Sequence, residues 1–350
     1  MNFKRIILVL GVFTLTLLIF LYTDFHKEDS ADVSFWTYDF NELNYTPPGE
    51  NFKDKNEFNS NSFRVRRYLV GLKNNPFFEV RGKDSSSEIE YFYEGGFPAK
   101  NLFNEFSVLN TKTMAKEEKS LLEKFSISPD SPKIELGYDG EMEKVLSLGE
   151  RNRDKTARYV LTEEFLITLP NYVIDKFTSK PQSLRHRQIL SLGDDSLEEI
   201  KGKFENQSYF FENHGKDPKN NNEDKWFKQK GKMEKINPEQ FSRLDGLLKS
   251  LSYDLYPDDD IADGFAVATK LTSGNPIFEI ELLTDKNRST TVFFYEAINF
   301  KDTHYMPVIR KVDKWQESPA YIKQDTFFQL QYILNEIQSS PEFKETQNKQ

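Results

Sequence analysis

The chain has 350 residues, of which 29% are charged and 37% hydrophobic, and its formal net charge is −9. This length predicts two domains of ordinary size. The negative charge, with no basic patch outside the extreme N-terminus, argues against nucleic acid as a partner. The absence of cysteine excludes disulfides, cysteine-ligated zinc, iron–sulfur clusters and thiol nucleophiles.

An apolar run near the N-terminus predicts a membrane anchor in contact with the lipid bilayer. Residues 6–22 contain no charge, and this length is close to that of a membrane-spanning helix and longer than the apolar region of a cleavable signal. We therefore expect residues 1–25 to form a cytoplasmic tip and a retained transmembrane helix, rather than a removed signal or a buried core helix. The residues expected in lipid are Ile6, Leu10, Phe13, Leu17, Phe20 and Tyr22.

Charges on the two sides of this run predict its orientation. Lys4 and Arg5 precede it, whereas acidic residues dominate positions 24–32. The positive-inside rule then leaves the N-terminus in the cytoplasm and carries the remainder across the membrane. We expect a single-pass protein of the inner (cytoplasmic) membrane whose bulk is periplasmic or otherwise extracytoplasmic, and the lack of cysteine fits a bacterial envelope.

Two stretches of the remaining chain carry the same succession of patterns. Pro98 and Pro238 each open a helical segment with an apolar stripe, and Pro132 and Pro276 each lead a strand that turns into a partner strand. A third strand follows at nearly the same spacing in both copies, and each copy closes with a helix. The last helix has an apolar stripe at Phe327, Leu330, Leu334 and Ile337.

These patterns predict an α+β fold: the N-terminal transmembrane helix, then two tandem repeats of antiparallel β-sheet with packed helices. The expected limits are residues 26–190 and 191–340 for the repeats and 341–350 for a polar tail. The alternative is a chance alignment of short apolar strands, because such runs recur in any β-rich chain.

An ordered series of elements spans Tyr172 to Leu251. A helical segment ends in Ser183-Leu184-Arg185-His186-Arg187-Gln188-Ile189-Leu190, strands follow, Lys225-Trp226-Phe227 closes a hairpin, and a leucine-rich helix ends the series. This series resembles the bacterial domain-of-unknown-function family 4340 (DUF4340), and Leu121 to Ile127, followed by the strand after Pro132, is similar to another element of that family. Residues 33–97 match it poorly.

The resemblance implies a membrane-anchored envelope protein that often accompanies an ABC-type transporter of the gliding-motility kind. It implies no known reaction, cofactor or catalytic residue.

Motifs for catalysis are missing from the sequence. The four histidines have no metal-ligand spacing, and no nucleophile elbow, phosphate-binding loop or dinucleotide fingerprint occurs. We therefore predict no enzymatic activity and no cofactor. A glycosidase-type carboxylate pair stays open, since 56 Asp and Glu residues always supply pairs.

One acidic cluster is a weak candidate for a cation site. Asp258, Asp260 and Asp263 offer hard oxygen ligands. The cluster departs from a calcium-binding EF-hand loop, because Ile261 and Lys270 occupy ligand positions. A solvated loop is the favoured interpretation.

Two arginines are the strongest candidates for a contact between the repeats or with a partner. Arg185 and Arg187 flank His186 near the predicted join, and their planar donors suit an anionic partner. We favour pairing with the local acids Asp194, Asp195 and Glu198. Trp226 is a further candidate for such a contact.

Two functions follow as hypotheses. The first is a non-enzymatic accessory or scaffold component of an envelope complex, such as an ABC-type transporter. The alternative is an extracytoplasmic ligand-binding or hydrolytic domain acting on envelope glycans or peptides. A deep pocket between the repeats, lined by converging acids and aromatic walls, would favour the alternative.

Overall fold

The computed structural model describes residues 33–49, 62–70, 75–84, 87–111, 114–178, 181–190, 195–205, 207–217, 223–259, 261 and 264–344. The predicted anchor at residues 1–25, including Ile6, Leu10, Phe13, Leu17, Phe20 and Tyr22, lies outside the described residues. Within the described part of the chain, no helix is both long enough and apolar enough to cross a membrane.

A nine-stranded antiparallel sheet forms the first unit, which ends at residue 184. Its strand order is β5-β4-β3-β2-β8-β9-β10-β11-β7. The strands are β2 (Glu42–Thr46), β3 (Phe63–Val70), β4 (Asn75–Lys83), β5 (Glu90–Glu94), β7 (Met114–Lys116), β8 (Lys133–Tyr138), β9 (Glu141–Arg151), β10 (Ala157–Leu161) and β11 (Phe165–Pro170). Beside them lie a two-stranded sheet of β1 (Val33–Thr37) and β6 (Val108–Thr111), the helices α2 (Phe97–Ser107), α3 (Lys119–Lys124) and α4 (Asn171–Thr178), and the 3₁₀ turn η1 (Pro181–Leu184).

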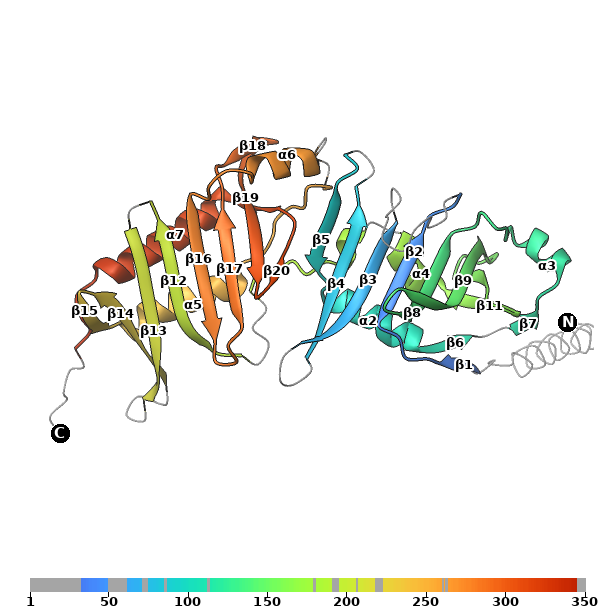
Figure 1. Cartoon of the computed structure of the whole chain (residues 1–350), viewed down its shortest axis with the longest axis horizontal. Helices are drawn as coiled ribbons and strands as arrows, with labels where there is room; N and C mark the ends of the chain where they lie inside the picture. The colour runs from blue at the N-terminus through green and yellow to red at the C-terminus, as the bar shows by residue number, and fades with distance from the viewer. Residues whose placement is uncertain are drawn as a thin grey trace, which may run out of the picture.

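A ten-stranded sheet forms the second unit, from residue 187 onward, with the path β15-β14-β13-β12-β16-β17-β19-β18 and with β20 and β21 also paired to β19. The strands are β12 (Leu197–Phe204), β13 (Gln207–Asp217), β14 (Glu223–Lys230), β15 (Lys232–Lys235), β16 (Phe278–Thr284), β17 (Ser289–Phe294), β18 (Ile298–Phe300), β19 (Thr303–Val312), β20 (Trp315–Gln316) and β21 (Ala320–Lys323). The helices are α5 (Pro238–Ser250), α6 (Gly264–Leu271) and α7 (Gln324–Ser339). The two units lie side by side along the long axis of the molecule (Figure 1).

The expected α+β class is wrong, because strands predominate over helices in the described residues and form three sheets. Much of the additional β-structure comes from residues 33–97, where β1 to β5 form. Neighbouring strands in this region pair through their backbones over up to eight residues, and such pairing depends on a partner elsewhere in the chain, which local sequence patterns do not reveal.

The two large sheets share a strand order. In each, a four-stranded meander (β2 to β5, β12 to β15) leads into a helix, and the next long strand then pairs with the first strand of the meander. The hairpins β8–β9 and β16–β17 extend both sheets in the same direction, which confirms the two hairpins expected after Pro132 and Pro276. This correspondence does not define where one repeat ends, so the limits 26–190 and 191–340 stay a prediction.

Helices cover one face of each large sheet and complete its core. In β16, alternate residues are buried, as expected of a strand with one face against helices. The apolar stripe of α7 is buried as predicted, and α5 begins at Pro238 after an Asn237 side chain that accepts a hydrogen bond from the Glu239 amide at 2.9 Å. In the first unit, α2 and α4 contribute to the corresponding core.

Candidate functional site

The edge strand β5 of the first sheet reaches into the second unit. On one face of β5, Tyr91 and Tyr93 belong to the apolar core of the second unit. On the other face, Phe92 lies against Trp315 of β20, with ring centroids 5.8 Å apart. The segment after β20 also bonds to the β5 backbone, since the Ser318 amide donates to the Phe92 carbonyl at 2.8 Å. The two units are thus fused through β5.

Arg185 lies at the centre of this join, and its side chain is fully buried. Its Nη1 and Nη2 donate to the two carboxylate oxygens of Asp258 at 2.7 and 2.9 Å. Three tyrosine rings surround the guanidinium at 4.4 to 4.8 Å from their centroids: Tyr91, Tyr93 and Tyr256. A planar cation with a bidentate carboxylate and stacked aromatic faces is well satisfied despite burial.

The electrostatics of this arginine favour its charged form. Burial alone would lower the pKa of Arg185, but the negative charge of Asp258 and the neighbouring tyrosines outweigh it, so the pKa lies above its ordinary value. Arg185 is therefore a fixed cation that serves the packing of the two units.

A second buried arginine completes the join. Arg310 of β19 pairs with Glu94 of β5, and Glu317 lies 3.9 Å from the same guanidinium. Glu317 also accepts hydrogen bonds from the Tyr253 hydroxyl at 2.7 Å and from the Glu94 amide at 2.6 Å. Burial raises the pKa of Glu94, but the positive charges of Arg310 and Arg288 outweigh it, so its pKa is lowered.

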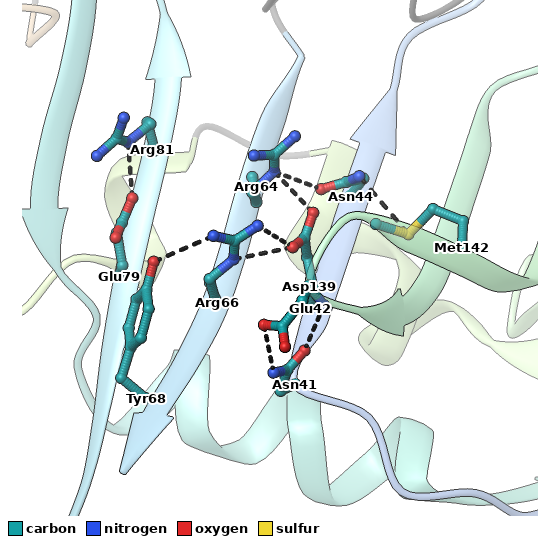
Figure 2. Close-up of polar contacts among 10 residues, drawn as sticks. All are labelled: Asn41, Glu42, Asn44, Arg64, Arg66, Tyr68, Glu79, Arg81, Asp139 and Met142. Carbon is teal, nitrogen blue, oxygen red and sulfur yellow. Dashed lines mark hydrogen bonds and ion pairs between the residues drawn. The ribbon is translucent and has the colours of Figure 1, made fainter. Parts of the chain in front are cut away.

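A ladder of charged side chains crosses the open face of the first sheet. Figure 2 shows Glu42 of β2 and the two arginines Arg64 and Arg66 of β3 pointing toward one another. Glu42 is fully buried, lies 3.0 Å from Arg64 Nε and accepts from Arg66 Nε at 2.8 Å. Asn44 Oδ1 accepts from Arg64 Nε at 3.0 Å.

The ladder continues on the adjacent strand β4, where Glu79 lies 2.6 Å from Arg81 (Figure 2). Each carboxylate of the ladder therefore contacts at least one arginine. These paired charges fix the register of β2, β3 and β4, because a one-residue shift of a strand would move its charged side chains into the apolar core.

The structure brings some of the predicted contact residues together. Arg187 lies half-exposed beside Arg185, donates to the Asp254 carbonyl at 3.0 Å and lies 3.6 Å from Asp259. The acids that pair with these two arginines are therefore Asp258 and Asp259 rather than Asp195 and Glu198, and Asp194 lies outside the described residues. Asp195 instead pairs with Lys286.

Trp226 does not lie at the join. It is buried within the second unit, where its ring stacks on Phe241 of α5 at 4.0 Å. The ring packs β14 against α5.

The structure describes one residue of the acidic cluster formed by Asp258, Asp260 and Asp263. Asp258 is engaged by Arg185 through both oxygens, whereas Asp260 and Asp263 lie outside the described residues. Among the described residues, no group of three or more His, Asp or Glu side chains is arranged to hold a metal ion.

Sequence analysis missed the other partners at the join, namely Glu94, Arg310 and Glu317. Glu94 is more than two hundred residues from Arg310 and Glu317 along the chain, and only the docking of β5 brings it to them. The alternating pattern Phe63-Arg64-Val65-Arg66 could have indicated that two arginines share the face away from the core.

A hollow on the surface of the second unit lies away from the join. It has a volume of about 940 Å³ and lies between α5 and the ends of β12 and β14. Charged pairs such as Lys249 and Asp245, 2.7 Å apart, line it. At the join itself, Arg185, Arg310 and Glu317 are buried.

Comparison with protein families identifies the central part of the chain. Residues 98–263, from the start of α2 to the segment before α6, match the model of the domain of unknown function DUF4340. This part of the chain belongs to the DUF4340 family. The match confirms the resemblance and contains Arg185 and Asp258. It does not reach β1 to β5, in agreement with the poor resemblance of residues 33–97. No curated protein and no solved structure matches the chain.

Proposed function

We propose that this DUF4340 protein is a non-enzymatic accessory or scaffold component of a bacterial envelope complex, such as an ABC-type transporter of the gliding kind. The observation that carries the proposal is the join, where Arg185 and Arg310 are buried with their carboxylate partners. A join of this kind holds two sheets as one body at a fixed mutual orientation. A scaffold uses such rigidity, whereas a protein that closes around a ligand opens and closes between its units.

The proposal includes a location. The uncharged run at residues 6–22 and the charges around it support a protein tethered to the cytoplasmic membrane with its two units on the extracytoplasmic side. Extraction with alkaline carbonate should leave the full-length chain in the membrane, and a C-terminal reporter that requires export should be active. Release by carbonate, or a reporter active only in the cytosol, would contradict this location.

Affinity capture of the full-length chain from gently solubilised membranes tests the accessory role. We expect a permease and an ATP-binding subunit to be recovered with it at native expression levels. Recovery of the chain alone would count against the proposal.

A variant of the join makes the test more specific. Arg185→Met removes the charge that ties Asp258 to the three tyrosines, and Arg187→Met is its matched control on the exposed side. If a fixed orientation is what the complex recognises, Arg185→Met should lower the recovery of partners and Arg187→Met should not.

A further inference from the structure

The turn between β9 and β10 concentrates positive charge in a chain that is acidic overall. Arg151, Arg153, Lys155 and Arg158 lie within eight residues, and Asp154 is the single carboxylate among them. The expectation that no basic patch exists outside the N-terminus overlooks this turn. Arg151 at the end of β9 and the two cations of the turn itself are exposed, whereas Arg158 at the start of β10 is half-buried.

Arg158 is the unusual member of this group. Its Nε is buried without a hydrogen-bond partner, and no described residue forms a hydrogen bond or ion pair with its guanidinium. Its direct neighbour across the strand pair is another arginine, Arg151, which itself pairs with Asp175 at 2.8 Å. Like charges directly opposite each other are unfavourable, and a partly desolvated cation without a direct hydrogen-bond or ion-pair partner costs free energy.

The electrostatics agree with this geometry. Burial is the main cause that lowers the pKa of Arg158, and the charge of Arg151 lowers it further. The charge of Asp175 and the hydroxyl of Tyr45 act in the opposite direction but do not outweigh these two causes. An anion placed between the two guanidinium groups would reduce the repulsion between Arg151 and Arg158 and would offset the desolvation of Arg158.

An open hollow of about 640 Å³ lies in front of these arginines. Its lining contains Arg151 and Arg158 on one side and the loop Ser126 to Ser131 on the other, which supplies three serines. Two carboxylates also line it: Glu150 accepts from the Ser126 hydroxyl, and Asp130 is exposed on the loop. Arg158 therefore faces a solvent-accessible space that contains further hydrogen-bond donors.

The serine loop is held firmly against β9. The Glu150 amide donates to the Phe125 carbonyl at 2.9 Å, and a Cβ at Gly149 would lie 2.6 Å from that carbonyl oxygen, so only glycine permits this approach. Within the loop, Ser131 Oγ accepts from the Ser128 amide at 2.9 Å and is buried. The hollow is thus a preformed feature of the first unit.

We propose that Arg158 and Arg151, with the Ser128 hydroxyl, bind the phosphate group of a small ligand or of a lipid headgroup. Guanidinium groups provide paired planar donors that match the oxygens of a phosphate, and hydroxyl donors complete its coordination. The site does not involve the join, and it does not depend on the proposed accessory function.

Titration of the full-length purified chain with inorganic phosphate tests the site, at constant ionic strength adjusted with chloride. Calorimetry or the shift of the unfolding temperature gives the affinity. We expect saturable binding that Arg158→Gln weakens about tenfold or more, since hydrogen bonds to charged groups contribute about 1.5–3 kcal/mol. Arg158→Lys, which keeps the charge but loses the planar donors, should show an intermediate loss.

The matched control is Arg243→Gln on α5, an exposed arginine paired with Glu336 at 3.0 Å; it should bind phosphate as the wild type does. Without phosphate, Arg158→Gln should be at least as stable as the wild type, because it removes a partly buried cation that lies opposite Arg151 and has no hydrogen bond or ion pair with a described residue. The proposal is overturned if chloride replaces phosphate equally well, if Arg158→Gln binds normally, or if both variants lose binding to the same extent.

A second ligand distinguishes the two sources of phosphate. Glycerophosphorylglycerol carries the diester of a phosphatidylglycerol headgroup. Tighter binding of this diester identifies a lipid headgroup as the ligand, whereas tighter binding of inorganic phosphate identifies a free phosphate or a monoester.

Discussion

Arg185 and Asp258 are 73 residues apart in the chain, yet both guanidinium Nη atoms of Arg185 donate to Asp258 at 2.7 and 2.9 Å. The arginine follows the last turn of the first unit, and the aspartate lies in the loop between α5 and α6 of the second. The pair therefore joins the two units at the point where Tyr91 and Tyr93 of β5 enter the second core.

Replacement of Arg185 should strongly destabilise the chain. Arg185→Met leaves Asp258 largely buried without a partner, and breaking a buried pair from one side costs about 3–5 kcal/mol. Denaturant unfolding monitored by tyrosine and tryptophan fluorescence measures this loss. The control Arg187→Met removes a half-exposed contact of 3.6 Å and should cost less than about 1 kcal/mol; equal losses in the two variants would contradict the role of Arg185.

The stability of the chain should depend on Glu94 at acidic pH. Its pKa is lowered in the folded state from an ordinary value of 4.5, so the folded chain binds a proton less readily than the unfolded chain. Its contribution is therefore complete above about pH 4.5 and is lost as the pH falls through the lower folded value.

Unfolding at a series of pH values between 7 and 3 tests the contribution of Glu94. Glu94→Gln should be less stable at neutral pH and should lose less stability on acidification than the wild type. The exposed carboxyl Glu141 provides the control, because Glu141→Gln should leave the acid dependence nearly unchanged. If the free energy of unfolding of Glu94→Gln falls with decreasing pH as steeply as that of the wild type, other carboxyls are responsible for the acid dependence.

The charge ladder on the first sheet should contribute to stability through Glu42. Glu42→Gln removes the fully buried charge that Arg64 and Arg66 share, and we expect a loss of about 3 kcal/mol or more. Asp39→Asn is the matched control, since Asp39 pairs with Arg67 at the surface. Chemical denaturation of both variants measures the loss in the free energy of unfolding. A loss below about 1 kcal/mol for Glu42→Gln would mean that the ladder contributes little to stability.

Lys228 should stabilise the C-terminal end of α7. Its side chain is fully buried, and Nζ donates to the carbonyl of Ile337 at 2.7 Å and to the hydroxyl of Ser340 at 3.0 Å. Lys228→Met removes these donors from the last turn of the helix, which should cost about 1–3 kcal/mol.

Amide hydrogen exchange localises the effect of this variant. Exchange should become faster in the last two turns of α7 in Lys228→Met, while α5 is affected less. Lys216→Met, at an exposed lysine of β13 that pairs with Asp224 at 3.0 Å, should leave exchange in α7 nearly unchanged.

Much of the helical framework can be predicted from local patterns. Pro98 and Pro238 lie at the starts of α2 and α5, and the stripe from Phe327 to Ile337 is the buried face of α7. These features depend on neighbours within about four residues, so the sequence displays them directly. The hairpins β8–β9 and β16–β17 are local in the same sense.

Residues 33–97 show the limit of such patterns. Strands β2 to β5 form the outer half of the first sheet, but β2 also pairs with β8, about ninety residues further along the chain. The energy of that pairing depends on a distant partner, and this is why the predominance of strands did not appear in the local patterns.

The sequence by itself determined the composition without cysteine, the uncharged N-terminal run, the positions of the main helices and the family resemblance, because each is a property of short segments. Only the tertiary structure decided which charges meet. Asp258 pairs with Arg185, and Glu94 pairs with Arg310 across the join, because these contacts arise when β5 docks on the second unit. Arg158 is conspicuous for the same reason: the sequence contains its charge, but only the folded chain places it beside Arg151 without a hydrogen bond or ion pair from a described residue.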